Sequence, residues 1–148
     1  MNRLPDTVDK AAVEDGSDQM FSLLGAAHAL ESRLEERLGQ VGLSMSKLGV
    51  LTQLVESEKA LPLSELAARL SCVRSNMTQL VDRLEGEGLV RRVDDPSDRR
   101  SVLAEVTELG RSRQVAGADE LAKIREQFTQ ALPAGDRAAL GRILAALG

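Results

Sequence analysis

Residues 63–100 have the sequence LSELAARLSCVRSNMTQLVDRLEGEGLVRRVDDPSDRR, and their apolar spacing predicts two short helices in succession. Ser64 is expected to cap the first helix, and residues 71–73 are expected to connect it tightly to a second helix that begins at Arg74. The second helix has one apolar face and one polar face, as in a helix-turn-helix. We therefore predict a helix-turn-helix at about residues 64–86.

The polar face of the second helix carries the residue types that read base edges in double-stranded DNA. Arginine pairs with guanine, asparagine and glutamine pair with adenine, and a threonine methyl contacts the thymine methyl. These residues cluster in the first half of the helix, which is the part that enters a major groove. The candidate DNA contacts in this unit are Ser64, Arg74, Ser75, Asn76, Thr78, Gln79 and Arg83. The alternative is the solvated face of an ordinary core helix.

The hydrophobic period changes after the second helix. Residues 89–93 and 101–106 are β-prone and flank a polar turn at residues 94–100, which predicts a hairpin with a long charged tip. Arginines on a narrow loop suit insertion into a minor groove. The candidate DNA contacts on this hairpin are Asp98, Arg99 and Arg100. The alternative is a charge-balanced surface turn. Together with the helix-turn-helix, the hairpin predicts a winged helix with its wing at about residues 88–106.

Amphipathic helices are also expected on both sides of the winged helix. Residues 17–42 contain one, and residues 107–148 contain two, which begin near Thr107 and Pro133. They carry more apolar side chains than a small winged helix has surface to bury, so we expect a homodimer in which a twofold partner covers them. The alternative is a helical hairpin packed on its own chain.

The expected fold class is mainly α (α+β): a winged helix-turn-helix with N- and C-terminal dimerisation helices. Residues 43–106 are expected to form the DNA-binding domain, joined in one compact unit with the dimerisation helices at residues 17–42 and 107–148. Residues 1–16 show no helical period and are expected to form a flexible arm.

Composition narrows the class of partner. The formal net charge is −4, but residues 69–100 hold seven Lys and Arg against six Asp and Glu, so a modestly basic surface is expected on an acidic body. Two Phe and no Trp or Tyr argue against a module that stacks aromatic side chains on single-stranded bases. A single cysteine allows no intrachain disulfide, and no apolar run is long enough to span a membrane. We therefore expect a cytoplasmic protein with no membrane partner.

The wing resembles that of the MarR family of bacterial regulators. The family's wing signature is Asp-x-Arg, five residues, Leu-Thr, two residues and Gly. The matching residues are Asp98, Arg100, Thr107 and Gly110, with Val106 in place of the Leu. Residues 63–100 resemble the family's helix-turn-helix, and LSMSKLGVLTQLVE, residues 43–56, resembles the helix before it.

This resemblance covers about residues 17–147 and implies a dimer that places two winged helices on one palindromic operator in double-stranded DNA. It implies that Arg100 enters a minor groove and that Asp98 orients it. It also implies a repressor that releases a promoter when a small-molecule effector binds between the dimerisation helices and the winged helix.

The turn between the two short helices departs from the family's pattern. The family usually has a Gly, an apolar residue and a capping polar residue, where this chain has Ser71, Cys72 and Val73. Ser71 is therefore expected to adopt a left-handed backbone, and Val73 cannot cap the second helix. Cys72 precedes a helix N-terminus close to Arg74, which makes it a candidate redox-sensing thiol; the alternative is a packed core thiol.

The remaining chemistry-bearing residues are few. His28, the only histidine, is a candidate effector contact or pH sensor, and the alternative is a surface or interface histidine. One histidine and one cysteine do not make a structural zinc site, so no metal or cofactor is expected. The sequence contains no nucleophile elbow or phosphate loop, so we do not expect an enzyme.

We therefore predict a sequence-specific transcriptional regulator that binds double-stranded DNA as a dimer and represses in a ligand-responsive way. One alternative is a winged-helix protein-interaction module without DNA binding. Another is a thiol redox-sensing regulator that acts through Cys72.

Overall fold

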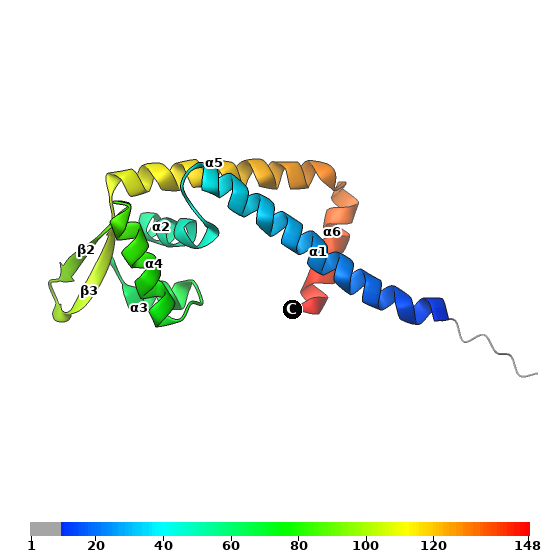
Figure 1. Ribbon diagram of the computed structural model, residues 1–148, viewed down its shortest axis with the longest axis horizontal. Coiled ribbons are helices and arrows are strands. Elements are labelled where there is room, and N and C mark those ends of the chain that lie inside the picture. The colour runs from blue at the N-terminus through cyan, green and yellow to red at the C-terminus, as the bar shows by residue number, and fades with distance from the viewer. Residues whose placement is uncertain (1–9) are drawn as a thin grey trace, which may run out of the picture. The chain divides into compact units, whose positions relative to one another are not determined.

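The computed structural model describes residues 10–148 and divides the chain into two compact units, one ending at Arg33 and the other comprising Leu34–Gly148. The elements are α1 (Lys10–Gln40), α2 (Met45–Ser57), β1 (Leu61–Pro62), α3 (Leu63–Arg69), α4 (Arg74–Gly86), β2 (Val90–Asp95), β3 (Asp98–Val106), α5 (Glu108–Ala131) and α6 (Ala134–Leu147). All of them except β1 are labelled in Figure 1. The expected fold class is confirmed, because the described residues are mainly helical and contain one three-stranded antiparallel sheet.

Helix α1 begins at Lys10, earlier than the start expected at residue 17. Gly16 does not interrupt it, because an isolated glycine inside a helix costs only about 1 kcal/mol relative to alanine. The expectation of a flexible arm is therefore wrong for residues 10–16, which are helical. The rest of that arm, residues 1–9, lies outside the described residues.

The core of the unit Leu34–Gly148 places α4 against α2, α3 and the sheet. The sheet has the order β1-β3-β2, with Leu61 opposite Ala104 and Val90 opposite Val106. The expected apolar face of α4 is confirmed, with Leu80 partly buried and Met77, Val81 and Leu84 fully buried. Helix α4 is thus held by its inner face, which leaves its polar face on the surface.

The start of α3 differs from the expectation. Ser64 is not the cap, because α3 begins at Leu63 and Pro62 occupies the N-cap position. Strand β1 ends at Pro62, so the helix follows the strand without a linker. Ser64 therefore lies in the first turn, where its backbone is helical, and a cap residue needs a non-helical backbone. Its side chain is exposed.

A close contact joins the wing to the start of α5. The Thr107 Oγ1 accepts a hydrogen bond from the Gly110 amide at 3.0 Å and donates one to the Gly88 carbonyl at 2.6 Å. The Thr107 amide donates to the Leu89 carbonyl at 3.1 Å. Gly110 packs so tightly here that an added Cβ would lie 2.0 Å from the Leu89 oxygen. This threonine and this glycine therefore fix α5 against the base of the wing.

Candidate nucleic-acid interface

The polar face of α4 is exposed along its whole length. Its exposed candidate contacts are Arg74, Ser75, Asn76, Thr78, Gln79 and Arg83. The buried side chains of the same helix set this orientation, since residues three and four apart share a helix face. One of these polar groups is engaged within the helix: the Thr78 Oγ1 donates to the Arg74 carbonyl at 3.1 Å.

The turn before α4 has the geometry expected from the way its sequence differs from the family's turn pattern. Ser71 has a φ of 49°, in the left-handed region that costs strain for a residue with a side chain. Val73 occupies the N-cap of α4 and makes no side-chain cap hydrogen bond. The first backbone amides of α4 therefore receive no acceptor from this side chain and stay available to an outside anion.

Residues from three elements meet beside the first turn of α4. Ser64 of α3, Arg74 and Thr78 of α4, and Arg100 of β3 line one hollow of about 190 Å³. Residues far apart in the sequence are thus brought to one place, with two arginines that can bind an anion. This convergence makes the hollow the centre of the candidate interface.

The tip of the wing is shorter than expected. Strands β2 and β3 extend to Asp95 and Asp98, so only Pro96 and Ser97 lie between them instead of a turn at residues 94–100. The Asp95 Oδ1 accepts hydrogen bonds from the Ser97 amide at 2.8 Å and the Ser97 hydroxyl at 2.7 Å, which closes the turn. The same two bonds hold the pKa of the Asp95 carboxyl below its usual range. An aspartate that bonds its own turn removes the need for a longer loop.

Arg99 and Arg100 therefore lie on strand β3 and not in a loop. Successive side chains of a strand point to opposite faces, so only one of the two can face α4. Arg100 is that residue, because it lines the hollow beside α4. The Asp98 Oδ1 accepts a hydrogen bond from the Arg100 backbone amide at 3.0 Å. Asp98 thus holds the backbone of Arg100, and not its guanidinium.

The basic residues of this region fall into two groups. Ion pairs engage Arg69 with Glu65, Arg91 with Glu105, and Arg92 with both Asp82 and Glu85. The hydrogen bond with Asp82 is the main cause that raises the pKa of the Arg92 guanidinium. Within residues 10–148, no ion pair engages the side chains of Arg74, Arg83, Arg99 and Arg100. The total charge of residues 69–100 did not reveal which arginines are ion-paired and which are not. The pairing of Arg91 with Glu105 agrees with the hairpin register, which places the two residues opposite each other.

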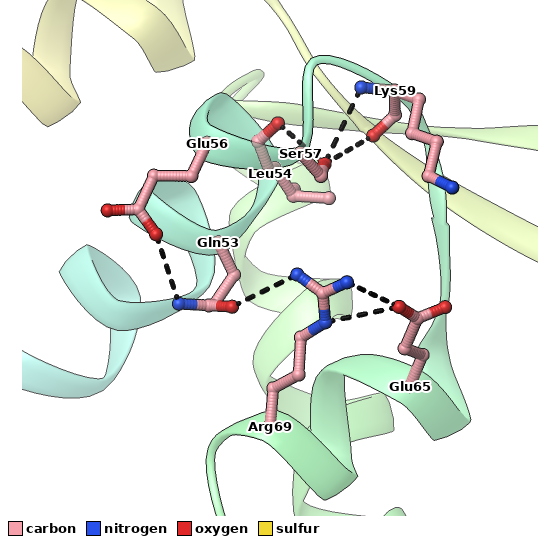
Figure 2. Close-up of polar contacts among 7 residues, drawn as sticks. All are labelled: Gln53, Leu54, Glu56, Ser57, Lys59, Glu65 and Arg69. Carbon is pink, nitrogen blue, oxygen red and sulfur yellow. Dashed lines mark hydrogen bonds and ion pairs between the residues drawn. The ribbon is translucent and has the colours of Figure 1, made fainter.

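Arg69 stabilises the helix-turn-helix from the side of α2 (Figure 2). Its Nη2 lies 2.5 Å from the Glu65 Oε1 on its own helix, and its Nη1 donates to the Gln53 Oε1 of α2 at 3.3 Å. Gln53 in turn donates to Glu56 at 3.5 Å. This chain of contacts joins α3 to α2, so Arg69 has a structural role there.

Neither Cys72 nor His28 lines the hollow that contains Arg100. Cys72 is partly buried, and its Sγ donates to the Val73 carbonyl at 3.5 Å. It lines a separate apolar hollow of about 290 Å³ together with Leu70 and Leu80. His28 is exposed on α1, within the unit that ends at Arg33.

Neither a metal-binding cluster nor a membrane-spanning helix is present in the described part of the chain. No group of three or more metal-ligating side chains comes together within residues 10–148. Across the same residues, each helix is too short or too polar to cross a membrane.

A family model supports the resemblance of the wing and helix-turn-helix. The model described as "MarR family" matches residues 43–102, which include the helix-turn-helix and most of the wing. Over its winged helix, the chain is therefore similar to the MarR family. The resemblance of Arg100 and the Thr107–Gly110 junction to the MarR wing signature thus has a structural basis in the contacts above.

The curated relatives are transcriptional regulators of the helix-turn-helix type. The chain is 35% identical over 82 residues to the HTH-type transcriptional regulator PrsX of Escherichia coli, which covers 55% of this chain and 49% of PrsX. It is 30% identical over 101 residues to the HTH-type transcriptional repressor MdtR of Bacillus subtilis, which covers 68% of this chain and 64% of MdtR. The chain thus spans about half to two thirds of the length of these relatives.

Solved structures of related transcriptional regulators have folds similar to that of this chain. A MarR family regulator from Streptomyces coelicolor in complex with DNA is 29% identical, with a TM-score of 0.77 over 99% of this chain and 91% of that one. The transcriptional repressor CouR, bound to a 23-mer DNA duplex, is 28% identical, with a TM-score of 0.74 over 86% of this chain and 89% of that one. CouR from Rhodococcus jostii has also been solved with p-coumaroyl-CoA.

Proposed function

We propose that this chain is a sequence-specific transcriptional repressor of the MarR family that binds a palindromic operator in double-stranded DNA as a homodimer. The observation that carries the proposal is the convergence of Arg74 and Arg100 on one hollow, beside the exposed Asn76 and Gln79 of α4. On this proposal, Asn76 and Gln79 read base edges in a major groove, and Arg100 enters the adjacent minor groove of the same duplex. The DNA-bound relatives support the same reading of the fold.

Unpartnered apolar side chains support a homodimer. On α5 and α6 the exposed large apolar residues are Leu109, Val115, Leu121, Phe128, Ile143, Leu144 and Leu147. On α1, within its own unit, they are Met20, Phe21, Leu23 and Leu24. Helix α6 contributes no buried residue at all within the described chain. Exposed apolar side chains in such numbers are typical of a protein interface, and a second copy would cover them in a closed twofold assembly.

We infer that a small-molecule effector binds between α5 and the winged helix and releases the DNA. A hollow of about 520 Å³ supports this place; it is lined by residues of α2 and α5 and by the end of α4. Its charged lining residues are Lys47, Glu87 and Arg113. Lys47 pairs with Glu87 at 2.6 Å. Within the described residues this leaves the Arg113 guanidinium, a donor to the Val41 carbonyl at 2.8 Å, as the unpaired charge that an anionic effector could meet. A ligand wedged there would alter the position of α4 relative to α5 and so the spacing of the two α4 helices in a dimer.

The direct test titrates the chain onto a duplex from the region upstream of its own gene. We expect specific binding, two chains per site, that weakens steeply as salt rises, because each neutralised phosphate releases counterions. A scrambled duplex of the same length and composition is the control. Failure to bind either duplex at low salt would favour the protein-interaction module instead.

Separate removal of Asn76 and Arg100 tests the assignment of the site. Asn76→Ala and Arg100→Ala are each expected to weaken operator binding, because each removes a contact worth about 1–3 kcal/mol per half-site. Asn76→Ala should relax the preference at one base position of each half-site. The measurement is a binding titration of each variant on the operator and on operators changed at single positions.

The matched control for these two variants is Arg91→Ala. Arg91 lies on the same hairpin, but its Nη2 is 2.5 Å from Glu105, so its charge is already paired. We expect its operator affinity to stay within about twofold of that of the parent. Parent-like affinity of both Asn76→Ala and Arg100→Ala would show that the site is wrongly assigned.

A further inference from the structure

One side chain, Arg92, joins the wing to α4. Arg92 lies on β2, and its Nη2 is 2.5 Å from the Asp82 Oδ1 of α4. Its Nη1 pairs with the Glu85 Oε2, and its backbone amide donates to the Glu85 Oε1 at 3.1 Å. Its side chain is 27% exposed, against 65% for Arg91 on the same strand. The guanidinium is therefore held inside the junction of wing and helix.

Asp82 and Glu85 continue the polar face that carries the candidate base contacts. Asp82 is three residues beyond Gln79 on α4, and Glu85 is three residues beyond Asp82, so each of the two carboxylates is a neighbour, on the helix surface, of the residue three positions before it. Two carboxylates on a face that approaches DNA are exposed to the negative potential of the phosphates. If Arg92 turned toward a phosphate, it would leave both carboxylates unpaired, which makes the present arrangement the favoured one.

We propose that Arg92 is a positioning residue for DNA binding, which fixes the wing relative to α4 through Asp82 and Glu85 and does not itself contact DNA. The inference rests on the proposed function of the chain as a DNA-binding regulator. The contacts of Arg92 with Asp82 and Glu85 form a joint between the wing and α4. This joint matters because α4 and the wing must enter neighbouring grooves of one duplex at the same time. A wing free to swing relative to α4 loses that match, even with Arg100 intact. Arg92 thus differs in role from Arg100, eight residues further along the hairpin.

A mutant cycle on the full chain separates positioning from direct contact. The variants are Arg92→Ala, the pair Asp82→Ala/Glu85→Ala, and all three together, each titrated onto the duplex that the parent binds. We expect Arg92→Ala and the carboxylate pair each to weaken binding about tenfold, and the triple variant to be no weaker than either, because all three remove the same joint. The slope of log affinity against log salt is expected to stay at the parent value.

A direct phosphate contact gives a different set of results. Arg92→Ala would then reduce the salt slope by about one unit per half-site and would cost as much in the Asp82→Ala/Glu85→Ala background as in the parent. Tighter binding by Asp82→Ala/Glu85→Ala than by the parent would mean that the carboxylates only repel DNA. Parent-like binding by Arg92→Ala would mean that the joint has no effect. Each of these results overturns the proposal.

The variant Arg92→Lys distinguishes loss of the joint from loss of folding. Lysine keeps the charge but cannot bridge two carboxylates with a planar fork. We expect Arg92→Lys to melt within a few degrees of the parent and still to bind DNA several-fold more weakly, whereas lysine would largely replace arginine in a phosphate contact. If the parent itself binds no duplex, the proposed function fails; if the parent binds and the cycle is additive, only the role of Arg92 fails.

Discussion

A chain carrying Ile143→Glu and Leu144→Glu is expected to become monomeric and to lose operator affinity by about a thousandfold or more. Both side chains are exposed on α6, which contributes no buried residue to the described chain, so the charges should leave the winged helix folded. In the proposed homodimer the same side chains are covered by the partner, where unpaired carboxylates are costly. A monomer can engage one half-site only, and it forfeits the second half of the binding free energy.

Size measurement by sedimentation, together with a titration on the operator, checks this prediction. The control is Arg142→Glu, which changes the net charge of the chain by the same amount as the double variant and lies in the same turn of α6. We expect Arg142→Glu to remain dimeric. A double variant that sediments as a dimer and binds like the parent would exclude this face of α6 from the dimer interface.

Gly110→Ala is expected to destabilise the chain by about 3 kcal/mol. The added Cβ would lie 2.0 Å from the Leu89 oxygen and 2.8 Å from the Val106 Cγ2. The oxygen belongs to the backbone, and the Leu89 carbonyl also accepts the Thr107 amide, so it cannot withdraw without the loss of that hydrogen bond. The start of α5 must therefore move away from the wing, which opens the contact that Thr107 makes with Gly88.

Thermal unfolding measures this effect, with an expected fall in Tm of roughly 6–12 °C. Gly39→Ala is the matched control, because Gly39 also lies in a helix and has no atom within 4 Å of an added Cβ. That variant is expected to be as stable as the parent or more stable by up to about 1 kcal/mol. An unchanged Tm for Gly110→Ala would contradict the tight packing of α5 on the wing.

The helix-turn-helix was predictable because its signals are local. The apolar positions of α4 recur at helical spacing, and Met77, Val81 and Leu84 are buried as that spacing requires. A helical repeat of apolar residues therefore suffices to predict which face of a helix is buried. The left-handed backbone at Ser71 was expected from the family resemblance, because the family usually has a glycine where this chain has a serine.

Of three features that the sequence did not reveal, the wing tip depends on a local contact and the other two depend on partners distant in the chain. The wing tip is short because Asp95 bonds Ser97, which competes with the loop that its polar composition suggested. The cap of α3 was misassigned because β1 pairs with β3 and brings Pro62 directly to the helix start. Charge counting could not separate Arg92 from Arg100, because the separation comes from two carboxylates on another element.

The most direct test of the central claim is a selection of binding sites from random-sequence DNA duplexes by the purified full-length chain. The account predicts enrichment of an inverted repeat whose two half-sites have centres about one helical turn, or a multiple of it, apart, roughly 34–36 Å per turn. Recovery of sequences that do not differ from the starting pool, at low salt as well as at physiological salt, would contradict the claim that this winged helix reads DNA.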